Sequence, residues 1–222
     1  KNWIIDHFGE CLWEGYGSTE TGMITTMPPD MQRRKPGSSG RPYRHVKLEI
    51  RGEDGTVLPA GETGEIWTWT RGLIDRYLNA PPLGPDTLDD RGFFRTGDMG
   101  RLDEDGFLYI SDRAKDMIIA GGVNIYPAEI EHVLQAHPAV ADAAVIGIPD
   151  DEMGERVLAF CELKPGRHAT PDELIAHCSA SLATYKRPRE IRIVDELPRN
   201  TIGKLLKREL RAPFWKDRDR LV

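Results

Sequence analysis

Short runs of alternating apolar and polar residues fill much of the first half of the chain and are typical of β-strands. Residues 48–51 alternate apolar and polar side chains, residues 65–70 alternate again from Trp67 onward, and a Glu-Asp-Gly turn lies between the two runs. A second turn, from Asp103 to Gly106, leads into another strand-like run at 107–110. This spacing predicts a small antiparallel sheet or a distorted barrel.

The first forty residues show less periodicity. Apolar positions within residues 1–10 predict a helix that ends near Gly9, and residues 11–14 predict a short strand. Residues 15–22 form a tight polar loop, and residues 23–40, rich in Pro, Met and Gly, are expected to be a long connector.

Helix signals and apolar runs of strand length alternate in the second half. Pro127 opens a helix that is predicted to reach Gln135, with acidic residues near its start. Thr170-Pro171-Asp172-Glu173 is a capping box that predicts a second helix running through Leu182. The other predicted elements are strands at 140–148, 156–163 and 190–195 and a final helix at 204–211. Together they predict a compact α/β domain of about 100 residues.

The change of character between the two halves falls in residues 111–127. Charged residues are crowded there against the pair Gly121-Gly122, and a proline then opens the helix. We interpret this stretch as the joint between two domains, with a ligand passing close to the Gly-Gly backbone.

Composition narrows the class of protein. The formal net charge of -6 argues against a nucleic-acid partner. Cys11, Cys161 and Cys178 are odd in number and lack metal-ligand spacing, so neither a disulfide framework nor a zinc site is expected and a reducing, cytoplasmic compartment is favoured. His132 and His137 are five residues apart and do not share a helix face as two metal ligands would. No apolar run approaches the roughly 20 residues of a transmembrane segment.

Two loops carry candidate chemistry. Gly15 to Gly22 combines three glycines, hydroxyl groups and one carboxylate, which suits a nucleotide or anion site but equally a hydroxyl-rich surface turn. Asp98 follows a Thr-Gly pair and is predicted to lie just after a turn. Its carboxylate either caps the next segment or accepts hydrogen bonds from the hydroxyl groups of a ligand.

Five segments in one order carry a resemblance to a known family. They are Gly15-Tyr16-Gly17-Ser18-Thr19-Glu20-Thr21-Gly22, Arg95-Thr96-Gly97-Asp98, Asp112-Arg113-Ala114-Lys115-Asp116-Met117-Ile118, Gly121-Gly122-Val123-Asn124-Ile125-Tyr126-Pro127-Ala128-Glu129-Ile130-Glu131 and Pro198-Arg199-Asn200-Thr201-Ile202-Gly203-Lys204. The series resembles the adenylate-forming superfamily of acyl-CoA synthetases, peptide-synthetase adenylation domains and firefly luciferases, over essentially the whole chain. The resemblance implies a mixed α+β and α/β fold, in which the β-rich distorted-barrel subdomain of the large domain precedes a small mobile α/β domain. The implied parts are residues 1–35 from the large domain with the nucleotide loop, 36–114 as the β-rich subdomain, and 115–222 as the mobile domain.

The resemblance also implies a nucleotide site. By position in the family's motifs, the ring of Tyr16 packs against adenine, Thr19 contacts phosphate, and Asp98 accepts from both ribose hydroxyls. The implied nucleotide-binding residues are Tyr16, Gly17, Thr19, Asp98 and Arg113, and Glu20 is the implied ligand of Mg²⁺.

The remaining implied roles belong to two half-reactions. Lys204 is the family's catalytic lysine for adenylation, and Lys115 is the hinge about which the C-terminal domain swings. Gly121 and Gly122 then face the thiol of CoA, where a Cβ would narrow the path of the pantetheine arm. The basic residues between 186 and 211 are either a site for the phosphates of CoA or an ordinary solvated surface.

One block of the family is missing. Nothing in residues 1–15 resembles its Ser/Thr/Gly-rich phosphate loop, so we expect the chain to be the C-terminal part of a longer enzyme and to have little or no ligase activity alone. The predicted activity of that enzyme is AMP-forming ligation of a fatty or other apolar carboxylic acid to CoA, with ATP, Mg²⁺ and CoA required. The alternatives are an adenylation enzyme that loads a carrier protein and a non-catalytic binding module. Homodimer formation is left open.

Overall fold

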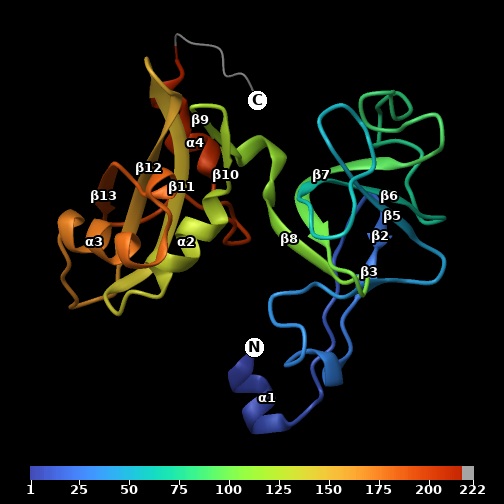
Figure 1. The fold of residues 1–222 in the computed structure, drawn as a ribbon, viewed down its shortest axis with the longest axis horizontal. Helices are drawn as coiled ribbons and strands as arrows, with labels where there is room; N and C mark the ends of the chain where they lie inside the picture. The colour runs from blue at the N-terminus through green and yellow to red at the C-terminus, as the bar shows by residue number, and fades with distance from the viewer. Residues whose placement is uncertain (217–222) are drawn as a thin grey trace. The chain divides into compact units, whose positions relative to one another are not determined.

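The computed structural model describes residues 1–216 and forms two compact units, Lys1–Ser111 and Asp112–Val222, each with its own sheet (Figure 1). This arrangement confirms the predicted mixture of a β-rich part and an α/β part. No helix within the described part of the chain is long and apolar enough to cross a membrane.

The first unit begins with helix α1 (Asn2–Phe8), which ends at Gly9 with φ 76°, as predicted. The strand expected at 11–14 is wrong. The Cys11 amide donates to the Gly9 carbonyl at 2.9 Å, so the chain turns directly after the helix, and only Glu14 forms a bridge, with Met27. The predicted polar loop holds β1 (Gly17–Ser18) and the start of β2 (Gly22–Met23). The predicted connector holds β3 (Thr25–Thr26) and the 3-10 turn η1 (Pro29–Met31), and β4 (Arg41–Pro42) follows it.

The main sheet of this unit has four strands in the order β5 (Lys47–Arg51), β6 (Gly64–Trp69), β7 (Phe94–Leu102) and β8 (Leu108–Arg113). The β5–β6 and β6–β7 pairs are antiparallel. Of the two forms that the sequence left open, the described residues adopt an open sheet rather than a closed barrel.

The turn predicted around Thr96 and Gly97 is wrong, because both lie inside β7. The register shifts between Glu65 and Trp67 of β6, Gly97 has φ 71°, and the Thr96 hydroxyl donates to the Ile66 carbonyl at 2.8 Å. These features describe a bulge, which re-aims side chains along an otherwise regular strand. The bulge therefore sets the direction of Asp98.

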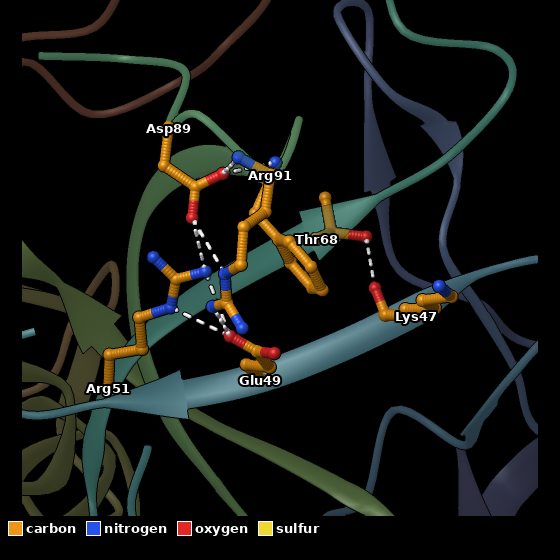
Figure 2. A network of polar contacts seen from close by, with 7 residues as sticks. Lys47, Glu49, Arg51, Thr68, Asp89 and Arg91 are labelled. Atoms are coloured by element: carbon orange, nitrogen blue, oxygen red, sulfur yellow. Dashed lines mark hydrogen bonds and ion pairs between the residues drawn. The ribbon is translucent and has the colours of Figure 1, made fainter. Parts of the chain in front are cut away.

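A buried arginine ties the segment between β6 and β7 to the sheet (Figure 2). The Arg51 side chain, only 6% exposed, donates to Glu49 at 2.9 Å and to Asp89 at 2.8 Å. The Arg51 guanidinium also lies 4.2 Å from the ring centre of Trp67. Asp89 additionally accepts from the amides of Arg91 and Phe93. The network fixes the end of residues 71–92 beside strand β5.

Replacing Arg51 by Ala is expected to destabilise the first unit by about 3 kcal/mol, the low end for breaking a buried ion pair, because both carboxylates keep some contact with solvent. Urea unfolding followed by tryptophan fluorescence measures this change. Arg91, 57% exposed and paired with the same Glu49, supplies the control, and Arg91→Ala should have little effect. Equal losses from the two variants would contradict a role for burial.

The same network predicts a dependence on pH. Burial acts to raise the pKa of Asp89, but hydrogen bonds from the Phe93 amide and the Arg51 guanidinium outweigh it, so the pKa lies below its usual value. A depressed folded-state pKa means that the stabilisation is present above the unfolded pKa of about 3.9 and is lost as the pH falls through the folded value.

The second unit is a mixed sheet covered on both faces. Its strands are β9 (Ile118–Ala120), β10 (Val123–Ile125), β11 (Val140–Asp150), β12 (Gly154–Leu163) and β13 (Glu190–Val194), in the order β10-β9-β12-β11, with β13 parallel to β12. The predicted central strands are confirmed, whereas the β9–β10 hairpin was not anticipated. Its short helices are α2 (Pro127–Gln135), α3 (Pro171–Ser181) and α4 (Lys207–Arg211), and its 3-10 turns are η2 (Ala114–Asp116), η3 (Thr184–Lys186) and η4 (Ala212–Phe214).

Strand β11 is a continuous apolar run because both of its faces are buried. Val145 packs with Ile130 of α2 and Leu174 of α3 on one face. Ile146 packs with Leu197 and with the partly buried Leu210 of α4 on the other. Alternate residues of a strand point to opposite faces, so such a run serves two cores at once.

The predicted starts of α2 and α3 are confirmed. Both helices have proline in the first turn, and Thr170 and Glu173 form the expected capping box. The final helix predicted at 204–211 is shorter and comprises only Lys207–Arg211. The division at Ser111 lies close to Lys115, and the predicted hinge at that lysine stays a prediction.

Candidate active site

The structure brings together two residues that lie 82 positions apart in the sequence, Tyr16 and Asp98. The Tyr16 hydroxyl donates to Asp98 Oδ2 at 2.6 Å, and both side chains are half-buried. The Asp98 amide is held by the Thr96 hydroxyl at 3.1 Å. This arrangement suits a nucleoside, because an aromatic ring can pack against the base while the carboxylate accepts hydrogen bonds from the ribose hydroxyls.

The turn between β1 and β2 carries the other candidate nucleotide residues. A Cβ at Gly17 would lie 2.2 Å from the Gly22 carbonyl oxygen, so glycine is required there for strand pairing alone. The Ser18 and Thr21 hydroxyls are 3.1 Å apart and each accepts from the other's backbone amide, which closes the turn. Thr19 lies exposed at its tip.

Glu20 follows Thr19 in the same turn and contacts a segment that sequence reasoning left aside. The Tyr77 hydroxyl donates to Glu20 Oε1 at 2.6 Å, and the Ile74 amide donates to the Glu20 carbonyl at 2.9 Å. The hydrogen bond to this carboxylate raises the pKa of the Tyr77 phenol. No pattern in the sequence pointed to Tyr77, which is 57 positions from its partner.

Lys204 lies in a tight loop built around Asn200. The Asn200 carboxamide oxygen accepts from the Lys204 amide at 2.8 Å, and the Asn200 amide donates to the Lys204 carbonyl at 2.9 Å. Gly203 takes φ 80°, and Arg199 donates to its carbonyl at 3.2 Å while also pairing with Asp142 of β11. This turn chemistry competes with helix formation and explains why α4 begins only at Lys207.

A cleft of about 580 Å³ in the second unit gathers three of the predicted residues. Arg113, Lys115 and Lys204 all line it. Its six cationic lining residues are Arg113, Lys115, Lys204, Lys207, Arg208 and Arg211, and its acidic ones are Asp112 and Asp116. A cleft with this excess of positive charge favours anionic ligands.

Two ion pairs hold α4 beside this cleft. Lys207 pairs with Glu131 of α2 at 2.8 Å, and Arg211 pairs with Asp116 at 2.8 Å. Burial raises the pKa of Glu131 even though Lys207 acts to lower it. Asp112 accepts from the Ala128 amide at 2.7 Å and so caps α2. The two ion pairs fix α4, the helix that follows the Lys204 loop, within its unit.

Gly121 and Gly122 form the two-residue turn of the β9–β10 hairpin. Both have positive φ, 59° and 77°, as a type I′ turn requires. A Cβ at Gly121 would lie 2.5 Å from Met153 Cε, whereas a Cβ at Gly122 would have no atom of the described residues within 4 Å beyond its chain neighbours. Met153 and Ala120 also line a second cleft, of about 520 Å³, that includes Arg156, Arg187 and Arg189.

The fold and these loops are those of an AMP-binding protein with a separate C-terminal unit. The family described as "AMP-binding enzyme" matches residues 1–78, and that described as "AMP-binding enzyme C-terminal domain" matches residues 129–204. The chain belongs to the adenylate-forming superfamily.

Three relatives illustrate the similarity. The chain is 42% identical to a fatty acid–acyl-carrier-protein ligase, ScoC, from Streptomyces coeruleorubidus, over 93% of this chain and 40% of that protein. It superposes on o-succinylbenzoate CoA synthetase from Bacillus subtilis in complex with its acyl-adenylate intermediate with a TM-score of 0.86 and 38% identity, over 94% and 42% of the two chains. The same synthetase in complex with ATP and a magnesium ion gives a TM-score of 0.81 and 40% identity, over 89% and 41%. The chain thus spans about 40% of the length of the relative ScoC.

Proposed function

We propose that the protein carrying this chain is an AMP-forming carboxylic acid:CoA ligase, which activates an acid with ATP as acyl-AMP and then transfers the acyl group to CoA. The observation that carries the proposal is the cationic cleft that unites Lys204 with Arg113 and Lys115. The similarity to a CoA synthetase solved with its acyl-adenylate supports the same reaction.

The first half-reaction builds negative charge on the α-phosphate as the carboxylate attacks. Lys204 lies on the loop that Asn200 holds, and its positive charge stabilises the oxygens of the α-phosphate. The Tyr16–Asp98 pair orients the nucleoside. The described residues contain no cluster of three or more potential metal ligands. A lone Glu20 carboxylate fits Mg²⁺, which proteins usually hold through one or two carboxylates together with substrate phosphates. Glu20 would hold the ion there, and its charge would neutralise part of the phosphate charge.

The second half-reaction needs a thiol beside the adenylate and a site for the rest of CoA. Gly122 leaves open space at the β9–β10 turn, and the cleft with Arg156, Arg187 and Arg189 begins at the neighbouring Ala120 and Met153. Its apolar wall suits the pantetheine arm, and its arginines suit phosphates. Since Lys204 and Gly122 lie at different places in the second unit, we propose that this unit turns about Lys115 between the two steps.

Replacing the exposed Arg189 by Ala is expected to raise KM for CoA about 5-fold, because a phosphate contact is lost, while KM for ATP is unchanged. Steady-state kinetics of the full-length protein measure both constants. Arg167→Ala is the control, because Arg167 is an exposed arginine in the loop between β12 and α3 and does not line the cleft. Equal shifts for ATP and CoA would contradict the assignment of this cleft.

Loading of a carrier protein is the second candidate, favoured by the 42% identity to ScoC. The acceptor in that reaction, a carrier protein, presents the same phosphopantetheine thiol but lacks the nucleotide of CoA. Comparing the transfer of one acid to CoA and to a phosphopantetheinylated carrier decides between the two. A fatty or other apolar acid remains our proposal for the substrate, and acids of graded chain length test it.

A further inference from the structure

The segment between β6 and β7, residues 71–92, forms a folded loop against the β1–β2 turn. Arg76 bridges to Pro82, and the Leu83 amide donates to the Asp75 carbonyl at 3.3 Å, so the loop closes on itself. Its contact with the turn is concentrated on Glu20, which receives one backbone and one side-chain hydrogen bond.

The loop is held at both of its ends. Near its start, a Cβ at Gly72 would lie 3.5 Å from the Thr21 carbonyl oxygen, which places the backbone beside the turn. Near its end, Asp89 is fixed by the buried Arg51 (Figure 2). Tyr77 is therefore presented to Glu20 from an anchored loop, although the residue is 50% exposed.

We propose that Tyr77 is the positioning residue for Glu20, orienting its carboxylate toward the metal of the bound MgATP. The proposal rests on the proposed function, because it takes Glu20 as the Mg²⁺ ligand. A carboxylate is a planar acceptor, and a phenol held 2.6 Å from one oxygen restricts rotation of the whole group. The direction of the carboxylate lone pairs is then fixed before the ion binds. Hydrogen bonds from outside the coordination shell orient other metal ligands in the same way.

Tyr77→Phe in the full-length protein tests the inference, with calorimetric titration of MgATP and of ATP in EDTA. Removing the hydroxyl is expected to weaken MgATP binding about 10-fold and to leave metal-free ATP unchanged. The Mg²⁺ concentration for half-maximal activity should rise by a similar factor. Tyr109→Phe is the matched control, since its hydroxyl is 3.4 Å from Asp103 in the same unit and does not contact Glu20. The proposal would be overturned if Tyr77→Phe left the affinity for MgATP unchanged, or if it lowered the affinities for MgATP and metal-free ATP equally.

The background Glu20→Gln separates positioning from a general effect of the loop. In that background Tyr77→Phe should add no further loss of MgATP affinity, because the carboxylate that it orients is gone. A second loss of about 10-fold would overturn the proposal. If the wild-type protein fails to bind MgATP at all, the proposed function fails and takes this inference with it. If the wild type binds and Tyr77→Phe binds equally, only this inference fails.

Discussion

Lys204→Ala is expected to lower acid-dependent ATP–pyrophosphate exchange about 10²–10³-fold, the usual cost of removing one preorganised charge from a transition state. Thioester formation from supplied acyl-AMP should remain near the wild-type rate. The reason is that the lysine acts on phosphate charge that exists only while the adenylate is made. Both steps are measured separately in the full-length protein.

The side chain of Lys204 is exposed, so its loss should not disturb folding. Lys164→Ala is the matched control, because that lysine is also exposed in the second unit and its ammonium group donates to the Pro138 carbonyl at 3.1 Å. It should leave both steps unchanged. Equal loss of both half-reactions in Lys204→Ala would refute the assignment of this lysine to adenylation.

Gly122→Val is expected to show the reverse pattern. Transfer from acyl-AMP to CoA should fall about 100-fold, because the added side chain displaces the thiol from its line of approach, while exchange of pyrophosphate continues. The prediction rests on the open space beside Gly122. The new side chain would extend into this space, because beyond the chain neighbours no described atom lies within 4 Å of its Cβ. Rapid-quench measurement of thioester formation gives the rate.

Backbone strain needs its own control, because a side chain at φ 77° costs about 1–3 kcal/mol. Gly166→Val supplies it. Gly166 has φ 69°, its Cβ position also has no atom of residues 1–216 within 4 Å, and it lies in the turn after β12. The two variants should lose similar stability, and only Gly122→Val should lose thioester formation. Loss of that step in both would mean that strain, rather than ligand approach, causes the defect.

Local signals predicted the elements whose boundaries are set locally. Helices α2 and α3 were found from a proline in the first turn and from the Thr170 capping box, both of which act within four residues. The start of α4 was misplaced because the side chain of Asn200 accepts a hydrogen bond from the Lys204 amide, which favours a turn over a helix there. Helix propensity alone does not decide between these two structures. The Gly-Gly pair was interpreted only as a ligand contact, although it also makes a type I′ hairpin turn.

The site was predicted as a set of motifs but not as a geometry. Tyr16 and Asp98 were each assigned to the nucleotide by resemblance, yet the hydrogen bond between them joins segments 82 residues apart. Tyr77 lies in a loop without periodicity, and only tertiary folding places it on Glu20. Contacts of this range depend on how the sheet and its connecting loops pack, which a single sequence does not encode in its spacing.

The central proposal, two half-reactions served by separate places on one unit, is tested most directly by giving preformed acyl-AMP and CoA to Lys204→Ala and Gly122→Val side by side. We expect Lys204→Ala to form thioester at close to the wild-type rate and Gly122→Val to form it about 100-fold more slowly. Equal rates in the two variants, whether both fast or both slow, would contradict it.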